Sequence, residues 1–575
     1  MDANLSLTGA SWKKEGADPK HTKSMAGLSG CTKELIECLA LRGATSIEDA
    51  ERILSPSIDH LHHSSSMHGV DRAVERIKLA VKNSESVRIV TDYDVDGTTS
   101  SLILQATLRL LGLSVTYHIP NRKGEGYGFS CIAAQKAADD GVGLLITADI
   151  GVRDHASVEL SNELGVDVII CDHHLPAGES VPQGAIVLCP PQECCDYPNP
   201  SLAACGVSLK LAEALLAEHP KRDLIILSLM KLVAIGTVAD VVDLMNPENR
   251  ALVALGLEQI NVTRNAPGLN ALLEVSGATL GAVTAADIGF KIGPRINAAG
   301  RISSATTIVD LISCKEHDKA RAIANQVEKL NLERRAIQEA LLDEISADLL
   351  GPEAPPVPNV IVVSGDEQLG WHRGITGIVA ARIRDKFNRP ALVVSYNGDT
   401  AVGSMRSIPA LHSVHLLDSC SDLLQKYGGH PAAAGFSLPT DKVSEFRERL
   451  NIKAGEMLDD EQPPHSYTAD LKVSPERLNI DLVDDLARLE PHGKGNPRPR
   501  LWVVGVKISS ANTMKDVHLK LRLKGANAEA IWWKGAQYEP QLLEADSVDL
   551  LGSLEVNTWG GRRRVQFIIS DARLN

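Results

Sequence analysis

The segment VRIVTDYDVDG places three aspartates, Asp92, Asp94 and Asp96, directly after a short apolar run and directly before a glycine. The β-branched run VRIV is typical of a buried strand, and the sequence that follows predicts a helix over residues 98–111. Carboxylates packed this closely repel one another unless cations hold them together. Open α/β sheets place ligands and chemistry at the ends of their strands. The segment therefore predicts an α/β fold with a cation site where a strand ends.

Two other interpretations of these aspartates fit less well. The D-x-D-x-D-G spacing is shared by calcium-binding EF-hand loops, whose twelfth residue is a bidentate glutamate, but the twelfth residue counted from Asp92 is Ile103. An EF-hand also needs a helix before the loop, and here a strand is expected. An acidic helix cap would require one Asp or Thr rather than three alternating carboxylates.

Strand-like runs alternate with helical stretches between residues 87 and 175. This alternation is typical of βαβ units that build a parallel sheet. The runs are VRIVT, SVTYHI, GLLITAD and VDVIICD, at residues 87–91, 114–119, 143–149 and 166–172.

The chain has 575 residues, of which 44% are apolar, and is too long for a single core. A long amphipathic helix is expected to begin with the capping box SCKE and to bridge two domains. Stretches rich in residues that interrupt helices lie before and after a second α/β segment. Short runs such as HLKLRL and RVQFIIS indicate a small β-barrel. The expected divisions are an N-terminal extension that can be flexible at 1–45, a parallel-sheet domain at 46–312, the connecting helix at 313–350, a second α/β domain at 351–458 and the β-barrel at 467–575.

Acidic and histidine side chains recur where three further apolar runs end. They are Asp149 after GLLITA, Asp172, His173 and His174 after VDVIIC, and Asp240 and Asp243 within LVAIGTVADVVDL. Each alone could be a helix cap or an ordinary hydrogen-bonded residue, and for Asp243 this is the preferred interpretation. Together they supply enough carboxylates and imidazoles for two cations. A mixed set of oxygen and nitrogen ligands suits manganese or magnesium better than zinc.

The formal net charge of −14 argues against nucleic-acid binding by the whole surface, but not against a local basic site. From residue 491 onward there are 13 lysines and arginines against 8 aspartates and glutamates, together with four of the six tryptophans. Basic charge with interleaved aromatics on short strands indicates an OB-fold that tracks a single nucleic-acid strand. At least half of these tryptophans are expected in the barrel core. The expected DNA contacts of the barrel are Lys494, Arg498, Arg500, Arg562 and Arg563.

No apolar run is long enough to cross a bilayer, and the nearest, residues 224–235, contains Lys231. The first residues include no apolar signal segment, so we expect a cytoplasmic location and no association with membranes. The ten cysteines include no C-x-x-C pair, which argues against a disulfide framework or a zinc ribbon. The spacing of the cysteines between Cys189 and Cys205 fits no standard metal-ligand pattern.

The motifs DYDVDG, TAD, DHH and GTVADVVDL, in this order, resemble the four metal-site motifs of the DHH phosphoesterase superfamily. GGHPAAAGF is similar to the glycine-rich signature of its associated DHHA1-type domain. Four further segments, IPNRKGEGYGFS, GPRINAAGRI, WHRGITGIVAARI and GSMRS, resemble those of one branch, the RecJ family of single-strand-specific 5′→3′ DNA exonucleases. The resemblance implies a DHH domain joined by the long helix to a DHHA1-type domain, with a C-terminal OB-fold.

The resemblance also implies a catalytic site for two Mn²⁺ or Mg²⁺ ions. Its metal ligands would be Asp94, Asp96, Asp149, His173 and Asp240, supported by Asp92 and Asp172. Neighbouring side chains at a strand end diverge, so His174 is expected to reach the scissile phosphate rather than the same ion as His173. The two metals would clamp this phosphate, generate hydroxide and stabilise the leaving 3′-oxygen. The product would be a 5′-mononucleotide.

Degradation from one particular end of a DNA strand requires further residues, because two metals alone do not distinguish the 5′ end from the 3′ end. In the family, the terminal phosphate is bound by residues that correspond here to Arg122, Ser404 and Arg406, and arginine forks suit phosphate recognition. The other substrate-binding residues implied are Arg295, Asn297 and Arg301 close to the metals, His430 with Gly428 and Gly429, and Tyr127 as a candidate for stacking on a base. Two positions, Ile150 and His492, depart from the family's pattern, and neither is a ligand.

The implied function is the removal of nucleotides from the 5′ end of single-stranded DNA in DNA repair and recombination. The resemblance further implies a monomer whose partners are single-stranded DNA, a single-strand-binding protein and a helicase. One alternative is another phosphodiesterase of the superfamily that acts on short oligonucleotides and would not need the basic barrel. The other is a non-catalytic replication scaffold, which would lose ligand residues first, whereas this chain keeps them.

Overall fold

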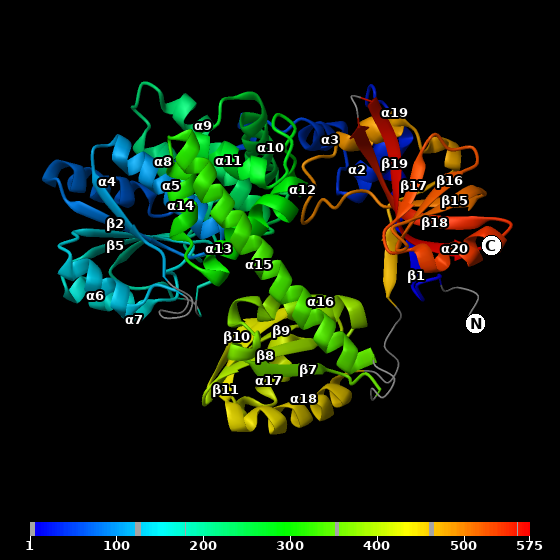
Figure 1. Ribbon diagram of the computed structural model, residues 1–575. Coiled ribbons are helices and arrows are strands. Elements are labelled where there is room, and N and C mark those ends of the chain that lie inside the picture. Colours follow the sequence, from blue (N-terminus) through cyan, green and yellow to red (C-terminus); the bar gives the residue numbers. More distant parts are fainter. Residues whose placement is uncertain are drawn as a thin grey trace. The chain divides into compact units, whose positions relative to one another are not determined.

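The computed structural model describes residues 6–120, 128–176, 178, 180–350, 356–458, 465–559 and 562–575, without the side chains at positions 558 and 559 (Figure 1). The predicted substrate-binding residues Arg122 and Tyr127 lie outside the described residues. Two compact units are present. The first comprises residues 1–293, 309–317 and 464–575, and the second comprises residues 294–308 and 318–463. None of the described helices combines the length and the apolar character of a membrane span.

A parallel five-stranded sheet in the order β3-β2-β4-β5-β6 forms one part of the first unit. Its strands are β2 (Ser86–Thr91), β3 (Ser114–His118), β4 (Leu144–Ala148), β5 (Asp167–Cys171) and β6 (Ala185–Leu188). The first four coincide with the predicted runs, which confirms the α/β prediction, and β6 has no predicted counterpart. Helices α4 (Val70–Asn83) and α5 (Val95–Leu110) lie on one face of the sheet, and α6 (Cys131–Asp139) and α7 (His155–Glu163) lie on the other (Figure 1).

The strand order brings three chain segments to one edge of this sheet. Because β2, β4 and β5 are neighbours and parallel, the residues that follow them emerge side by side. Every residue of β4 is buried, as expected for a strand covered on both faces. Asp92, Asp149 and Asp172 are the first residues after these three strands. The sheet itself thus gathers carboxylates that are distant in sequence.

Helix α5 begins earlier than predicted. The expected start was residue 98, but α5 begins at Val95 with Asp94 as its N-cap, whose carboxylate accepts a hydrogen bond from the Gly97 amide at 3.0 Å. Asp94 and Asp96 therefore lie at the start of a helix and not in a loop. Amide groups at a helix N-terminus stabilise negative charge there, which partly offsets the repulsion between these side chains.

The second unit contains most of the long helix and a mixed sheet. Helix α15 (His317–Leu350) begins at His317 and not at Ser313, because Ser313 is the last residue of the separate helix α14 (Thr306–Ser313). The segment SCKE thus ends one helix and leads to the next, and does not form the predicted capping box. The sheet has the order β10-β11-β9-β8-β7, with β7 (Ile361–Asp366), β8 (Ala391–Asn397), β9 (Thr400–Arg406), β10 (Lys426–His430) and β11 (Ala433–Pro439).

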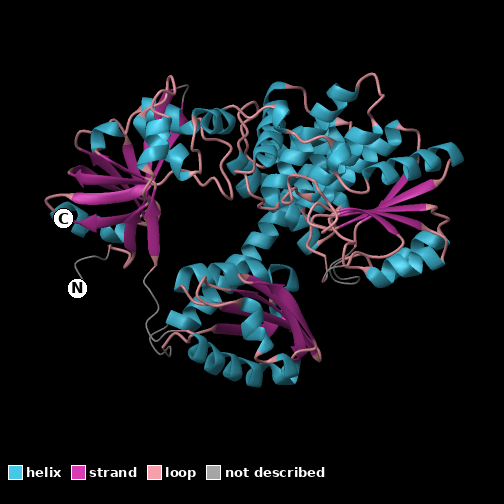
Figure 2. Cartoon of the chain, turned by 180° about the vertical axis from the view of Figure 1, so that it is seen from behind, coloured by secondary structure: helices cyan, strands magenta, loops and turns pink. Residues whose placement is uncertain are grey.

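The C-terminal region forms a seven-stranded sheet that curls around its own core. Figure 2 shows it as the group of magenta strands beside the C label. In spatial order its strands are β13 (Leu471–Val473), β14 (Leu501–Val506), β18 (Val548–Trp559), β19 (Arg562–Leu574), β17 (Glu529–Trp532), β16 (His518–Leu523) and β15 (Ile508–Met514). Apolar side chains alternate with polar ones along β16, as expected of strands with one buried face.

The described part of the N-terminal segment is folded onto this sheet and differs from the expected flexible extension. Strand β1 (Ser11–Lys14) pairs in parallel with β12 (Ser466–Ala469). Helix α2 (Lys33–Leu41) places Leu35 and Leu39, both fully buried, in the same core as the seven-stranded sheet. The partners of this segment follow more than 400 residues later in the sequence, so local patterns could not reveal them.

We expect Leu39→Ala to lower the free energy of unfolding by about 3 kcal/mol, because it removes apolar contacts and leaves a cavity in a closed core. Urea denaturation followed by tryptophan fluorescence measures this change. Leu79→Ala, at an exposed position of α4, is the matched control and should change stability by less than about 1 kcal/mol. Equal, small effects of the two substitutions would contradict the folded N-terminal segment.

Candidate metal centre

Three overlapping groups of side chains at the edge of the parallel sheet could each hold a metal ion. Within each group, the ligand atoms lie within 4.8 Å of one another. The groups are Asp92, Asp94 and Asp149; Asp96, His173 and Asp240; and Asp149, His173 and His174. The structure thus brings together every residue that the sequence analysis named as catalytic or metal-binding. It does not include Asp172 or Asp243 in any group among the described residues.

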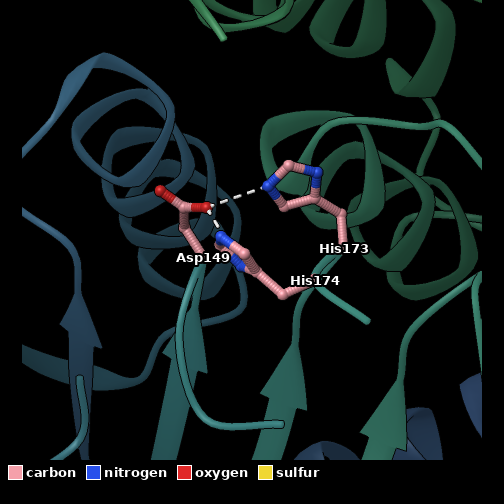
Figure 3. Close-up of side chains that lie close together, drawn as sticks. All are labelled: Asp149, His173 and His174. Atoms are coloured by element: carbon pink, nitrogen blue, oxygen red, sulfur yellow. Dashed lines mark ion pairs between the residues drawn. The ribbon is translucent and has the colours of Figure 1, made fainter. Parts of the chain in front are cut away.

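His173 lies between the carboxylates of different segments. Its Nε2 atom is 3.2 Å from Asp149 Oδ1 and 3.9 Å from Asp96 Oδ2, and its Nδ1 atom is 3.7 Å from Asp240 Oδ2. Figure 3 shows the Asp149 carboxylate facing both His173 and His174, with His174 Nδ1 at 3.9 Å from Asp149 Oδ1. The two imidazoles point to the same carboxylate from successive positions of the chain, although neighbouring side chains were expected to diverge. The expected contact of His174 with the scissile phosphate stays a prediction.

Asp96 is fixed by the start of a second helix. Its Oδ2 atom accepts a hydrogen bond from the Ala204 amide at 2.7 Å, and its Oδ1 atom accepts one from the Cys205 amide at 2.9 Å. These amides begin helix α8 (Ala204–Leu215). Asp96 is 1% exposed, and a buried carboxylate needs such donors to remain charged. The first turn of α8 therefore orients a predicted metal ligand, a role that the sequence analysis did not identify.

Gly236 on helix α9 (Arg222–Ala239) leaves the space in which Asp96 lies. A methyl group added at Gly236 would be 2.5 Å from Thr99 Oγ1, 2.6 Å from Cys205 Sγ and 3.0 Å from Asp96 Oδ1. Only glycine fits here without movement of one of these groups. Gly236 belongs to the motif GTVADVVDL, which drew attention only for its aspartates. The same helix ends at Ala239, and its C-cap is Asp240.

Asp172 belongs to none of these groups and orients His174. Its Oδ1 atom accepts a hydrogen bond from His174 Nδ1 at 2.8 Å and from the His173 amide at 2.7 Å, and its Oδ2 atom accepts one from the Val152 amide at 3.0 Å. Although burial opposes ionisation, the hydrogen bond with His174 holds the pKa of Asp172 below its ordinary value. The same contact raises the pKa of His174, against the effect of burial. Both shifts favour the charged forms of the two groups, a carboxylate and an imidazolium.

The remaining carboxylates are strongly perturbed. Burial raises the pKa of Asp149 well above its ordinary value, and the nearby charges of Asp94 and Asp96 raise it further. Burial and the same two neighbours raise the pKa of Asp240 to about 8. Asp149 also adopts a φ of 64°, a left-handed conformation that strains a residue other than glycine. The chain therefore holds carboxylates where repulsion and burial both oppose their charge.

The arrangement fits bound divalent cations. His173 Nε2 is buried and has no hydrogen-bond partner among the described residues, although carboxylate oxygens surround it. A cation would serve as the partner of this nitrogen and would offset the repulsion between the carboxylates. Carboxylate oxygens with few imidazoles are the ligands of hard cations such as Mg²⁺ and Mn²⁺. Among the described residues, no metal-binding group includes a cysteine, and the thiols of Cys189 and Cys205 are buried and free.

A second cluster, in the other unit, is suited to phosphate. Ser404 and Arg406 lie on β9, beside the start of helix α16 (Thr376–Phe387). Ser404 Oγ is 3.0 Å from Thr376 Oγ1, and a methyl group added at Gly377 would be 2.9 Å from Arg406 Nη2. A guanidinium, two hydroxyls and helix amides thus converge, which is a usual combination for phosphate. Thr376 and Gly377 lie in a segment quoted for the resemblance but received no role there.

The other predicted substrate residues of this unit make contacts of their own. Arg295 forms an ion pair with Glu328 at 2.5 Å, and Arg301 donates a hydrogen bond to the Gly374 carbonyl at 2.8 Å. Asn297 lies half-buried on the same helix α13 (Gly293–Ile302). His430 and Gly428 are exposed on β10, where a methyl group added at Gly429 would be 2.3 Å from the Ala433 carbonyl.

The predicted DNA contacts of the C-terminal sheet are in part paired with acidic residues. Arg498 forms an ion pair with Glu555, and Arg563 forms one with Asp484. Arg500 stacks on Tyr467, with 5.0 Å from its guanidinium to the ring centre, whereas Lys494 and Arg562 are exposed. Of the tryptophans, Trp532 is buried, Trp502 is half-buried and hydrogen-bonded to Asp549, and Trp533 is 55% exposed. The Trp559 side chain lies outside the described residues.

We expect Gly236→Ala to weaken Mn²⁺ binding about 10- to 100-fold, because the added methyl group displaces Asp96 from its helix amides. Isothermal titration calorimetry measures the affinity, and circular dichroism verifies the fold. Gly289→Ala is the control, since its methyl group would reach only Val238 Cγ1 at 4.0 Å. A folded Gly236→Ala variant with unchanged Mn²⁺ affinity would contradict the inferred role of Asp96.

Comparison with known proteins finds three domain families along the chain. Residues 86–237 match the DHH family N-terminal domain, residues 358–456 match the DHHA1 domain, and residues 469–571 match the RecJ OB domain. These matches and the observed elements confirm the predicted fold class. The boundaries proposed between the domains stay predictions.

Several relatives that match over most of the chain carry one name. The chain is 31% identical over 570 residues to the single-stranded-DNA-specific exonuclease RecJ of Bacillus subtilis, covering 98% of this chain and 71% of the relative. It is 33% identical over 553 residues to the Escherichia coli protein of the same name, covering 92% and 94% of the two chains. The crystal structure of RecJ in complex with Mn²⁺ from Thermus thermophilus is similar, with a TM-score of 0.82 at 29% identity, over 100% of this chain and 80% of the other. The chain therefore belongs to the RecJ family.

Proposed function

We propose that this protein is a metal-dependent exonuclease that degrades single-stranded DNA from the 5′ end to 5′-mononucleotides, in DNA repair and recombination. The observation that carries the proposal is the convergence of carboxylates and imidazoles from four separate chain segments on one cluster of ligand atoms. The names of its relatives supply the class of substrate. The Mn²⁺ of the Thermus thermophilus structure supports manganese or magnesium as the cofactor.

Two ions would be held by neighbouring sets of ligands. Asp92, Asp94 and Asp149 would hold one, and Asp96, His173 and Asp240 would hold the other. When bound, such a pair of cations activates a water molecule, clamps the scissile phosphate and stabilises the leaving oxygen. The chain itself orients these ligands through the amides of Gly97, Ala204 and Cys205.

His174 would act at the edge of this centre. The hydrogen bond from its Nδ1 atom to Asp172 raises its pKa and favours the charged imidazolium. A charged His174 beside Asp149 can donate a proton or a hydrogen bond to the phosphate. Asp172 is then the residue that holds His174 in this orientation.

Recognition of the 5′ end is proposed for the phosphate-binding cluster of the second unit. Ser404, Arg406 and the start of α16 offer donors that a terminal phosphate would use and that an internal phosphodiester, with fewer free oxygens, would use less well. Arg122 stays a predicted contributor. Arg295, Asn297, Arg301 and His430 stay predicted contacts to the strand.

Strands labelled at either end test the direction of degradation. With Mn²⁺, we expect a 5′-labelled single strand to release labelled mononucleotide in the first turnover, and a 3′-labelled strand to shorten before its label is released. Asp96→Asn should abolish the release and excludes a contaminating nuclease. Release that begins at the 3′ label would refute the proposed direction.

Two alternatives make different predictions. A phosphodiesterase for short oligonucleotides would prefer dinucleotides to long strands, whereas the basic C-terminal sheet favours long strands here. A non-catalytic scaffold would have no need for a complete set of metal ligands, and this chain retains all of them. A cytoplasmic location, a monomeric state and association with a single-strand-binding protein and a helicase are part of the proposal through the family resemblance alone.

Metal binding should release protons near neutral pH. The pKa of Asp240 is raised to about 8 in the metal-free protein, so at about pH 7 this carboxyl is largely protonated, and burial also raises the pKa of Asp149. Because a ligand must be ionised, the Mn²⁺ affinity should rise with pH up to about 8 and then level off. Calorimetry at pH 7 in buffers of different ionisation enthalpy measures the released protons.

The control for this experiment is Asp240→Asn, which should release fewer protons than the unmodified protein on binding Mn²⁺. Binding heats that do not depend on the buffer would show that the carboxyls are already ionised, and would contradict the perturbed pKa values of the cluster.

A further inference from the structure

One buried amide side chain joins two chain segments that lead to the metal cluster. Asn249 lies in the first turn of helix α10 (Pro247–Val262) and is fully buried. Its Nδ2 atom donates hydrogen bonds to the Ser201 carbonyl at 3.0 Å and to the Asp243 carbonyl at 3.1 Å. The two acceptors belong to segments that are separated in sequence, so this side chain holds them together.

Each of these segments supports one ligand of the same predicted metal ion. The segment after Ser201 begins helix α8, whose first amides hold the Asp96 carboxylate. The segment before Asp243 begins at Asp240, the C-cap of α9. Asp96 and Asp240 belong to one group of ligand atoms. The Asn249 amide thus links the backbone supports of two carboxylates that would bind one cation.

The turn that carries Asp240 is strained and needs to be held. Val241 adopts a φ of 59°, a left-handed conformation that β-branched residues rarely adopt. Such a backbone persists only where its surroundings fix it. The Asp243 carboxylate provides one contact, because it accepts a hydrogen bond from the Met245 amide at 2.8 Å. The bond from Asn249 to the Asp243 carbonyl provides another.

The Asn249 side chain is itself held by buried neighbours. Its Oδ1 atom accepts a hydrogen bond at 2.8 Å from Asn199 Nδ2, which also donates to Glu248 Oε2 at 3.1 Å. Asn199 Oδ1 accepts a hydrogen bond from the Ser201 amide at 3.1 Å. Asn199, Glu248 and Asn249 are all fully buried. Because both ends of the Asn249 amide have partners, it keeps one orientation.

We propose that Asn249 is a positioning residue for the metal ion bound by Asp96 and Asp240. It fixes the start of α8 relative to the turn after α9, and so keeps the two carboxylates at the separation that one ion requires. The inference rests on the proposed function, because it assumes that divalent cations occupy the cluster. The neighbouring site, which includes Asp92 and Asp149, is built on the ends of β2 and β4 and should not depend on Asn249.

We expect Asn249→Ala to weaken Mn²⁺ binding about 10- to 100-fold at the site of Asp96 and Asp240, and to leave the neighbouring site unchanged. Calorimetry counts the ions that still bind tightly, and anomalous diffraction from crystals with Mn²⁺ identifies the site that is weakened. In the metal-free protein, hydrogen exchange of residues 201–205 and 240–244 should become faster, which mass spectrometry of peptides measures.

Asn261→Ala is the matched control, at the other end of α10. Asn261 donates to the Val283 carbonyl at 2.9 Å and accepts from the Val283 amide at 2.7 Å, in a segment without a predicted metal ligand. This substitution should leave both metal sites unchanged. If circular dichroism shows that Asn249→Ala does not fold, Asn199→Ala tests the same link. It removes the donor to Asn249 Oδ1 and should weaken the same site about 3- to 10-fold.

The difference between the two sites separates positioning from a general effect on the fold. Equal weakening of both sites with a lower melting temperature would mean that Asn249 only stabilises the domain, and would overturn the proposal. Unchanged Mn²⁺ binding in a folded variant would overturn it as well. The unmodified protein tests the proposed function separately: two bound Mn²⁺ ions without hydrolysis of DNA would refute the nuclease function and leave the role of Asn249 in metal binding intact.

Discussion

The parallel sheet brings several carboxylates together, and the repulsion between them is the constraint that the rest of the metal centre must offset. β2, β4 and β5 are neighbours, so ligand atoms of the residues that follow them lie within a few ångströms of their neighbours and largely out of water, with Asp149 close to both Asp92 and His173. Charges buried in this way are unfavourable unless donors or cations compensate them. Backbone amides provide part of the compensation: Gly97 for Asp94, Ala204 and Cys205 for Asp96, and Val152 for Asp172. Divalent cations would neutralise the negative charge that these amides leave uncompensated.

The chain has a net charge of −14, and the positively charged groups proposed to bind phosphate are confined to a few places. Ser404 and Arg406, for example, lie beside the start of α16. A generally acidic surface repels a DNA strand, whereas such sites attract particular phosphates. The proposed contacts would therefore bind a strand through defined phosphates and not through the whole surface.

Much of the fold and of the metal centre could be predicted from the sequence, and the errors of the prediction have physical causes. The four strands and the aspartates at their ends follow from short apolar runs, since burial and strand ends leave a local pattern. The start of α5 was placed too late because the Asp94 side chain caps the helix, which an alternating run of aspartates conceals. The fold of residues 6–45 was missed because β1 pairs with β12, which is far away in sequence. The role of Gly236 depends on three helices meeting at Asp96, and no linear pattern records such a contact.

The most direct test of the central claim is a crystal of the protein grown with Mn²⁺ and measured at a wavelength where manganese scatters anomalously. The account predicts two anomalous peaks in the cluster, one in contact with Asp92, Asp94 and Asp149 and the other in contact with Asp96, His173 and Asp240. A map without peaks there, or with manganese bound only elsewhere in the molecule, would contradict it.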